Sequence, residues 1–461
     1  MIEEAISHAR AARAQRLALL CEWLRIPSVS MEPAYAGPMA EAAAWLRDHL
    51  ARLGLSRAEV VPTAGHPIVY AEWLGAGPAA PTLLIYGHYD VQPADPLDQW
   101  RTPPFEPTIM GDDLFARGAS DDKGQLFALV CAVESWLAAG GPPCNVKLLV
   151  EGEEEVSSAN LAPFVHAERE RLACDAVLIA DSAMLTPQLP LVLVGVRGNC
   201  YLDLEVRGPA TDLHSGTYGG AVENPLNVLV RLLARLQGDD RSVLVPGFYD
   251  DVRELGPEER FLLAAAPITE AQVLALTGAP ALAGEAGYGL VERLTARPTL
   301  EIHGLIGGYT GPGKKTIIPA AARAKVGMRL VPDQNPHTIA ERVAAFLHAN
   351  CPPTVTLRVE ALGDSWPALV DVGHPAVRAT EPAFKAAFGA APVFMRGGGS
   401  LPIVRDLQEA LGAPAVLIGF GLPDDNLHAP NEKLHLPNFH CGVEMAIHYM
   451  AQLARERQSI V

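Results

Sequence analysis

Short apolar runs alternate with helical stretches over the first 180 residues, and this alternation constrains the fold more than any other feature of the sequence. Four runs have the length and composition of buried strands: 68–74, 82–87, 145–150 and 176–180. Residues 122–138 predict a helix between two of them, and residues 1–25 and 39–53 predict amphipathic helices before them. Strands that alternate with helices indicate an α/β domain built on a mainly parallel central sheet.

Near residue 197 the pattern becomes typical of an α+β unit. Strands are expected at 201–207, 299–306, 322–330 and 354–361, and helices at 225–237 and 337–349. An acidic stretch, 239–297, has no regular pattern. After Pro367 the α/β pattern returns, with helix 375–388, strand 414–420 and helix 438–456. We therefore expect an α/β domain made of residues 1–196 and 366–461, interrupted by an inserted α+β domain at 197–365.

The charge of the chain excludes some classes of partner. The 461 residues include 53 acidic and 36 basic side chains, for a net charge of −17. Nucleic acids and anionic membranes bind basic surfaces, so we expect neither as a partner. The most apolar stretches, such as 189–196, are far shorter than the ~18 residues that cross a bilayer.

The cysteines and the N-terminus bear on the cellular compartment. Seven cysteines are scattered along the chain and form no CxxC pair. This argues against a disulfide scaffold or a zinc ribbon and for a reducing compartment. The first residues, MIEEAISHAR, have no apolar core of a signal peptide. We therefore expect a cytoplasmic protein.

Polar motifs follow three of the predicted strands directly. GHYDVQP at 87–93 places His88 and Asp90 after one strand, EGEEE at 151–155 follows another, and Asp181 follows a third. Ligands of open α/β sheets bind beyond the carboxyl ends of the strands, so a site is expected here. Taken singly, these motifs also fit a turn histidine, a solvated acidic run and a turn aspartate.

Two further motifs extend the set. Asp121 and Asp122, in ARGASDDKG at 116–124, stand at the start of a predicted helix, where acids also act as caps. His428 lies in the polar loop PDDNLHAPNEK, between a strand and the last helix. His435 and His440 have only weak zinc spacing, and we interpret them as structural.

The combined composition fits a metal site. Four carboxylates within 151–155 would repel one another at the end of a buried strand unless cations neutralised them. Two histidines and several carboxylates suit a hydrolytic centre with two divalent ions.

These motifs carry a family resemblance. The chain resembles the acetylornithine deacetylase, succinyl-diaminopimelate desuccinylase and carnosine dipeptidase family of co-catalytic zinc metallopeptidases over almost its whole length. GHYDVQP, GASDDKG, EGEEE and DLHSGTYGG occur in the family's order. The last two, with TIIP, MRLVP, RGGGS and HAPNEK, are most similar to the carnosinase-like dipeptidase branch. The resemblance implies a phosphorylase/hydrolase-like α/β catalytic domain and a ferredoxin-like inserted domain that serves as dimerisation element and lid.

The resemblance also implies a role for each residue at the strand ends. It implies two divalent ions per subunit, zinc or else manganese or cobalt, on five ligands: His88 and Asp181 on one ion, Glu155 and His428 on the other, and Asp121 bridging both. The Asp121–Asp122 peptide would be cis, and Asp90 would orient His88. Glu154 would be the general base that takes a proton from the metal-bridging water.

Substrate contacts follow from the same resemblance. His214, in DLHSG, would stabilise the oxyanion formed on a dipeptide's scissile carbonyl. Arg329 would bind the free C-terminal carboxylate through its guanidinium group. Thr316 and Ser400 would add hydrogen bonds.

The resemblance further implies assembly into a homodimer. In the dipeptidase relatives the inserted domain makes the dimer, and the histidine of the DLHSG motif reaches the neighbour's metal site. Helix 225–237 presents an apolar face, with Leu226, Val230 and Leu233, that would pair with its copy about a two-fold axis. We therefore expect a homodimer with composite sites.

Two segments depart from the family pattern, and both bear on substrate preference. ALGDSWPAL at 361–369 matches the dipeptidase loop only loosely and has no histidine, and 239–297 contains no motif that can be interpreted. Three interpretations remain: a dinuclear metallodipeptidase, which we favour; a relative that acts on N-acyl amino acids or as a carboxypeptidase; and a non-catalytic binding protein on this fold. The presence of all five ligands and Glu154 argues against the last.

Overall fold

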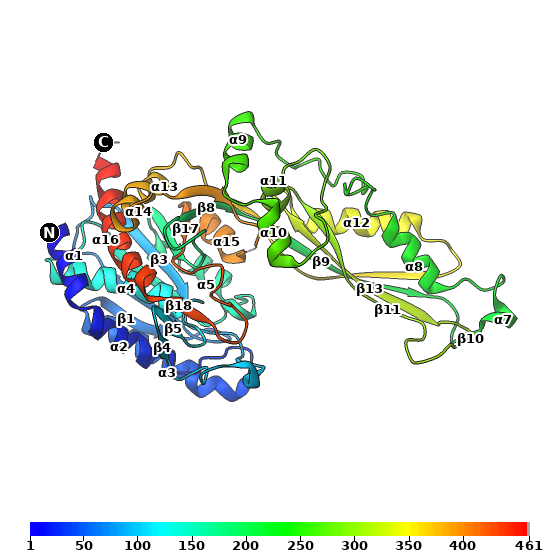
Figure 1. Ribbon diagram of the computed structural model, residues 1–461, viewed down its shortest axis with the longest axis horizontal. Helices are drawn as coiled ribbons and strands as arrows, with labels where there is room; N and C mark the ends of the chain where they lie inside the picture. The colour runs from blue at the N-terminus through cyan, green and yellow to red at the C-terminus, as the bar shows by residue number, and fades with distance from the viewer. Residues whose placement is uncertain (400, 459–461) are drawn as a thin grey trace. The chain divides into compact units, whose positions relative to one another are not determined.

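The computed structural model describes residues 1–399 and 401–458, which form two compact units (Figure 1). Unit 1 comprises Met1–Val194, Val370–Met395 and the chain from Ile403 onward; unit 2 comprises Gly195–Leu369 and Arg396–Pro402. The backbone explains why Arg396–Pro402 groups with unit 2. Arg197 N donates to Gly399 O at 3.0 Å, and Gly397 N donates to Gly195 O at 2.7 Å.

Unit 1 is built on a mixed sheet with the strand order β1-β2-β6-β3-β7-β17-β8. Its strands are β1 (Ser56–Val61), β2 (Ile68–Trp73), β3 (Thr82–His88), β6 (Asn145–Glu151), β7 (Ala176–Ala180), β8 (Leu191–Val196) and β17 (Ala415–Ile418), with β16 (Val393–Arg396) beside β8. The central strands β6, β3, β7 and β17 are parallel, whereas the outer pairs are antiparallel. The parallel strands are buried on both faces, which explains their continuous apolar sequences.

Helices and a small sheet complete unit 1. The helices are α1 (Ile2–Ala11), α2 (Arg13–Leu24), η1 (Pro33–Tyr35), α3 (Ala36–Arg52), η2 (Leu97–Gln99), α4 (Lys123–Ala138), η3 (Glu154–Val156), α5 (Leu161–Ala167), α6 (Arg169–Leu172), α13 (Pro375–Arg378), α14 (Thr380–Phe388), α15 (Pro402–Leu411) and α16 (Leu436–Gln458). The small sheet pairs β18 (Lys433–His435), β5 (Asp113–Phe115) and β4 (Thr108–Met110). Helix α4 packs on the central sheet and is covered in turn by α16 and α1. No helix within the described residues is both long and apolar enough to span a membrane.

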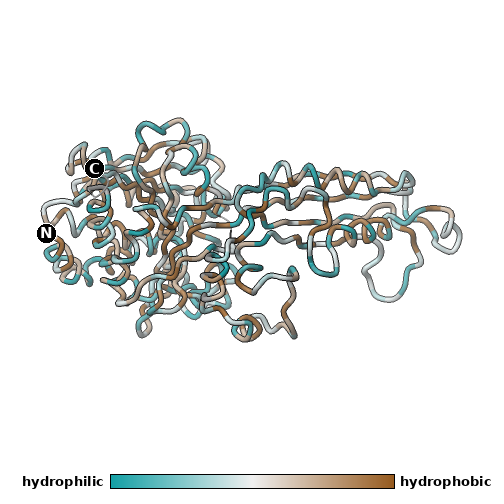
Figure 2. The backbone as a smooth tube through the Cα atoms, turned by 90° about the horizontal axis from the view of Figure 1, so that it is seen from above, coloured by the Kyte–Doolittle hydropathy of each residue, from teal (hydrophilic) through white to brown (hydrophobic). Residues whose placement is uncertain are grey.

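Unit 2 has the ferredoxin-like arrangement that the family resemblance implied. Four antiparallel strands lie in the order β11-β13-β9-β14, namely β11 (Thr299–Gly307), β13 (Ala321–Leu330), β9 (Gly198–Arg207) and β14 (Thr356–Ser365). Helices α8 (Pro225–Ala234) and α12 (Pro336–Asn350) pack against this sheet and bury one side of each helix in the core of the unit. Hydrophobic and hydrophilic residues therefore alternate along these elements (Figure 2).

Smaller elements lie around this sheet. They are β10 (Leu213–His214), α7 (Ser215–Tyr218), α9 (Pro257–Ala265), α10 (Glu270–Thr277), α11 (Leu290–Thr295) and β12 (Ile317–Ile318). Strand β15 (Ala368–Leu369) instead pairs with β8 at the edge of the large mixed sheet. Three of the helices fall within 239–297, where the sequence showed no regular pattern. They are short, so hydrophobic periodicity has little length over which to appear. A cap does mark one of them, since Thr269 and Gln272 form a capping box at the start of α10.

The α/β class with an inserted α+β domain is confirmed. Most predicted elements occur within a few residues of their expected bounds. The predicted helix at 1–25 is divided at Ala12, and the predicted helix at 375–388 is divided at Ala379.

Candidate metal centre

The candidate ligands of unit 1 come from segments that end at one edge of the central sheet. His88 is the last residue of β3, Asp181 follows β7, and Glu155 lies in η3 just after β6. These three parallel strands are neighbours, so their carboxyl ends meet. Asp121 comes just before α4, and His428 lies in the loop between β17 and β18.

His88 forms the first group with two carboxylates. Its Nε2 atom lies 3.2 Å from Asp121 Oδ1 and 3.9 Å from Asp181 Oδ2. Its other ring nitrogen, Nδ1, lies 3.1 Å from Asp90 O and 3.3 Å from Asp90 Oδ1. Asp90 therefore turns Nε2 toward the carboxylates, as expected of a residue that orients a histidine ligand.

His428 forms the second group with two carboxylates. Its Nε2 atom lies 2.9 Å from Asp121 Oδ2 and 3.3 Å from Glu155 Oε2. Asp121 thus presents Oδ1 to one group and Oδ2 to the other. In each group, one ligand atom from every residue lies within 4.8 Å of the others. A carboxylate that faces two such groups has the geometry needed to bridge two cations.

The acidic run 151–155 divides into residues that build the loop and residues that face the site. Glu151 accepts a hydrogen bond from the Tyr86 hydroxyl at 2.5 Å, and Glu153 accepts one from His66 N at 3.0 Å. Glu155 instead joins the second group, and its backbone N donates to Asp90 Oδ2 at 3.2 Å. The acidic run alone does not separate these residues, because identical residues carry no signal of direction; the distinct roles of Glu154 and Glu155 were implied only by the family resemblance.

Gln92, at this edge, was not singled out from the sequence, whereas Asp122 was named with Asp121 at the start of a predicted helix. Gln92 donates from Nε2 to Glu155 Oε2 at 2.7 Å, so it contacts a candidate ligand. Asp122 accepts a hydrogen bond from His88 N at 3.3 Å, and the Asp121–Asp122 peptide is cis, as the resemblance implied. Gln92 lies inside the GHYDVQP motif, so its position just after β3 was the available signal.

The electrostatics of the cluster fit a site for cations. Burial raises the pKa of Glu154 to about 8 and that of Asp181 to about 7. Hydrogen bonds to Asp121 and Glu155 raise the pKa of His428 to about 10. Burial lowers the pKa of His88, but Asp121 and Asp90 outweigh it and hold that pKa well above its usual range. The crowded carboxyl groups and the two histidines therefore favour protonation, and divalent ions bound here would displace those protons.

The donor atoms fit the metals expected from the sequence. Imidazole nitrogen and carboxylate oxygen suit zinc, manganese and cobalt. The buried His88 Nε2 atom has no hydrogen-bond partner of good geometry among the described residues, so it could serve as a ligand once deprotonated. His435 does not join either group and instead lies 3.1 Å from Asp113 Oδ1.

In unit 2, two of the candidate substrate-binding residues, His214 and Thr316, lie together, and the third, Arg329, lies far from them. His214 and Thr316 are exposed and adjacent, because β10 pairs with β12 and Ser215 N donates to Thr316 O at 3.1 Å. Arg329 lies near the opposite end of β13, where it pairs with Asn199. The nine residues from Ala321 to Arg329 span roughly 25 Å of extended strand. Figure 1 shows β10 and α7 beyond the other end of β9 and β13. Ser400 lies outside the described residues.

Comparisons with known proteins give a consistent result. Residues 84–452 match the model of peptidase family M20/M25/M40. The chain is 33% identical to a Cys-Gly metallodipeptidase of Schizosaccharomyces pombe, over 93% of each chain. It is 32% identical to the human Beta-Ala-His dipeptidase, over 95% of this chain and 89% of that one. A solved M20 family metallo-carboxypeptidase from Sulfolobus solfataricus is 35% identical, with a TM-score of 0.84, over 95% of this chain and 99% of that one.

Proposed function

Since the chain belongs to peptidase family M20/M25/M40, a family of metal-dependent peptidases, we propose that it hydrolyses the peptide bond of dipeptides with a dinuclear metal centre. Membership confirms the resemblance that the motifs indicated. The observation that carries the dinuclear assignment is Asp121, whose two carboxylate oxygens face two separate histidine and carboxylate groups.

The proposed ligands are those of the two groups. His88 and Asp181 would hold one ion, Glu155 and His428 the other, and Asp121 would bridge them. The two divalent ions, zinc or else manganese or cobalt, would lower the pKa of a water molecule and polarise the scissile carbonyl. We propose zinc first because histidine nitrogen and carboxylate oxygen are among its usual ligands.

Glu154 is the proposed general base. It is half-buried beside the ligand Glu155, and burial holds its pKa well above that of a free glutamate. Nearby cations would lower that pKa and favour the carboxylate form. In this form Glu154 accepts a proton from the attacking water and then donates it to the nitrogen of the leaving amine.

Unit 2 supplies the proposed substrate contacts. Arg329 would bind the C-terminal carboxylate, with Ser400 adding a hydrogen bond, while His214 would stabilise the oxyanion and Thr316 would assist it. A dipeptide is much shorter than the roughly 25 Å of strand between Arg329 and the pair at β10 and β12. We therefore propose that one substrate meets Arg329 of one chain and His214 and Thr316 of a second copy.

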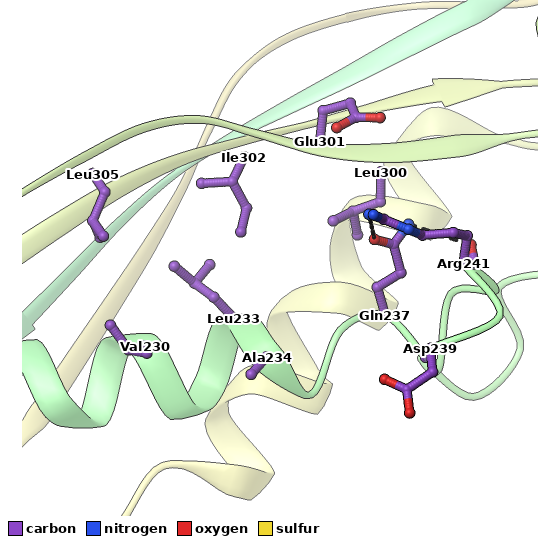
Figure 3. A pocket seen from close by; sticks show the side chains of 11 residues that line it. Val230, Leu233, Ala234, Gln237, Asp239, Arg241, Leu300, Glu301, Ile302 and Leu305 are labelled. Carbon is purple, nitrogen blue, oxygen red and sulfur yellow. Dashed lines mark hydrogen bonds between the residues drawn. The ribbon is translucent and has the colours of Figure 1, made fainter. Parts of the chain in front are cut away.

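A surface of unit 2 supports assembly into this homodimer. Val230 on α8 and Ile302 and Leu305 on β11 are each 48% exposed and line a cavity of about 600 Å³ (Figure 3). Strand β11 is also an edge of its sheet. An apolar surface beside an open edge strand favours association. Covering the apolar side chains and pairing the open backbone groups both lower the free energy of the protein in water.

The predicted apolar face differs in one detail. Leu233 lines the same cavity but is buried in the core of unit 2, so it adds little exposed surface. Val230 remains exposed, and the apolar residues of β11 take the place of Leu233.

We also propose a cytoplasmic location. All seven cysteines are free in the structure. Unpaired cysteines favour a reducing compartment, where thiols persist.

Carboxypeptidase activity is the second candidate, favoured by the similarity to the archaeal carboxypeptidase. Both activities need recognition of a free C-terminal carboxylate and differ in what lies on the amine side of the scissile bond. Free dipeptides, N-acetylated dipeptides, N-acetyl amino acids and tripeptides would separate them.

The test is a substrate panel on enzyme stripped with a chelator and then reloaded with zinc, manganese or cobalt. We expect no hydrolysis by the metal-free enzyme, recovery with at least one metal, and the highest kcat/KM on free dipeptides. Full hydrolysis by a demonstrably metal-free sample would refute the metal-dependent mechanism. A preference for N-acetylated dipeptides or tripeptides would instead favour the carboxypeptidase.

A further inference from the structure

Glu432, four residues after His428, is fully buried and accepts four hydrogen bonds. Its Oε1 atom accepts from Ser120 N and Asp121 N, both at 3.0 Å. Its Oε2 atom accepts from Gly118 N at 2.9 Å and from Arg117 Nη1 at 2.7 Å. One carboxylate therefore holds the backbone of the segment that ends at the bridging ligand.

Arg117 extends these contacts to two other segments. It is buried, and its Nη2 atom donates to Pro93 O at 3.1 Å and to Ala429 O at 3.3 Å. The pair of Arg117 and Glu432 thus joins the segment after His88, the segment before α4 and the loop that carries His428. A buried ion pair needs partners for its remaining hydrogen-bonding atoms, and here backbone groups supply them for every such atom except Arg117 Nε.

The loop that carries His428 needs such support. His428 has a φ of +58°, and its neighbours Asn426 and Asn431 have φ values of +56° and +66°. Residues other than glycine in the left-handed region each cost of order 1 kcal/mol or more, so the surrounding structure must hold them there.

Ser120 connects both ends of this loop to the segment of Asp121. Its backbone N donates to Glu432, and its hydroxyl donates to Asp425 Oδ2 at 2.9 Å. Asp425 also accepts from Leu422 N at 2.7 Å, which fixes the start of the loop. The loops of Asp121 and His428 are therefore attached to each other at two points.

We propose that Glu432 is a positioning residue that sets the distance between the ligands Asp121 and His428 by holding both of their loops. The proposal rests on the proposed metal ligands. Glu432 contacts neither of the two groups of ligand atoms directly and acts through the backbone at Asp121 and the loop of His428.

The carboxylate is essential to this role because it presents only acceptors. In Glu432→Gln, one oxygen becomes an NH2 group that must face either the N–H groups of Ser120 and Asp121 or those of Gly118 and Arg117. The new NH2 group then faces N–H donors without an acceptor between them. Because this costs free energy in a buried place, the segment that ends at Asp121 must move away.

The experiment titrates metal-free Glu432→Gln and wild type with zinc by calorimetry and records the absorption spectra of both proteins with cobalt. We expect 10- to 100-fold weaker binding of at least one ion, the range for losing a residue that orients ligands. The cobalt spectrum should also change, since it reports the geometry around the ion. Wild-type affinity together with an unchanged spectrum would overturn the proposal.

Glu444→Gln is the matched control. Glu444, on helix α16, is also buried. It accepts hydrogen bonds from Arg10 Nε at 2.9 Å and from Arg13 Nη2 at 3.1 Å. Both variants should lower the melting temperature, but only Glu432→Gln should weaken metal binding. Equal weakening in both would assign the effect to general destabilisation and overturn the proposal.

Asp121→Asn separates failure of this inference from failure of the proposed metal site. If Asp121→Asn loses metal binding and Glu432→Gln does not, only the positioning role is wrong. If Asp121→Asn also binds metal normally, the proposed site itself is wrong.

Arg117→Lys provides a second route should Glu432→Gln not fold. Lysine keeps the charge but cannot reach Glu432, Pro93 and Ala429 together as the planar guanidinium does. We expect roughly 3- to 10-fold weaker metal binding, less than for Glu432→Gln because Glu432 keeps its backbone contacts. Unchanged affinity in folded Arg117→Lys, with an unchanged cobalt spectrum, would overturn the proposal.

Discussion

Unit 1 brings its candidate functional residues together, whereas unit 2 holds its candidates far apart. Unit 1 gathers ligands from positions as distant in sequence as His88 and His428 into two groups whose atoms lie within 4.8 Å. Unit 2 places His214 and Thr316 at one end of a ladder and Arg329 near the other. Neighbouring parallel strands end at the same edge and so bring distant residues together, whereas a long antiparallel strand separates residues along its length.

This difference teaches which part of the reaction one chain can perform alone. The proposed ligands and Glu154 all belong to unit 1 of a single chain. The proposed contacts to substrate cannot all meet one dipeptide within a single unit 2. Metal binding is therefore expected of each chain separately, and efficient turnover is expected only of an assembly.

The largest expected effect distinguishes the proposed general base, Glu154, from the proposed metal ligand next to it, Glu155. Glu154→Gln should lower kcat by roughly 10²- to 10⁴-fold, because a general base is lost, while two ions remain bound. Glu155→Gln should instead weaken metal binding, because a ligand oxygen is lost. Metal content and kcat measured on both variants test this, and loss of metal from Glu154→Gln alone would mean that the two roles are reversed.

A smaller effect concerns Arg329 in unit 2. Arg329→Ala should lower kcat/KM for free dipeptides by about 10- to 100-fold, the value of a charge-assisted hydrogen bond to a carboxylate. Metal content should not change, because no proposed ligand lies in unit 2. Wild type should also cleave C-terminally amidated dipeptides poorly. Equal rates on amidated and free dipeptides would exclude recognition of the carboxylate by this residue.

The smallest expected effect is a partial recovery of activity, which tests whether His214 and Arg329 of one chain act in the active sites of different chains. His214→Ala and Glu154→Gln are each expected to be inactive, and subunit exchange between them makes about half of the dimers hybrids. If His214 acts across the interface, each hybrid has one intact site, so about a quarter of wild-type activity should return. Verified exchange without recovered activity would show that His214 serves its own chain.

Much of unit 1 was predictable from sequence because its signals are local. Strands β3, β6 and β7 are continuous apolar runs, and the residues directly after them occupy the edge of the sheet where a site is expected. The roles within the set came from the family resemblance rather than from spacing. The spacing alone did not indicate which acids of 151–155 face the site, since this depends on contacts with His66 and Tyr86; the roles of Glu154 and Glu155 came from the resemblance.

The residues that were not predicted depend on contacts distant in sequence. Glu432 acts on Asp121, more than 300 positions earlier, and no local pattern marks that pairing. Leu233 appeared to belong to an exposed face because helical periodicity does not tell which apolar residues face their own core. The helices of 239–297 are too short for their periodicity to be recognised.

The position of β17 in the central sheet has a consequence for the order in which the chain can fold during synthesis. This strand lies between β7 and β8 yet is translated long after both, once the contiguous stretch Gly195–Leu369 has emerged. At about 5–20 residues per second, the roughly 240 residues from Asp181 to the end of β17 take on the order of 10–50 seconds. Late in that interval, once Ser365 is made, the inserted unit has its whole sheet available, while the sheet of unit 1 still lacks a central strand. His428 arrives later still, so the second of the two proposed metal positions would stay incomplete until the C-terminal segment leaves the ribosome.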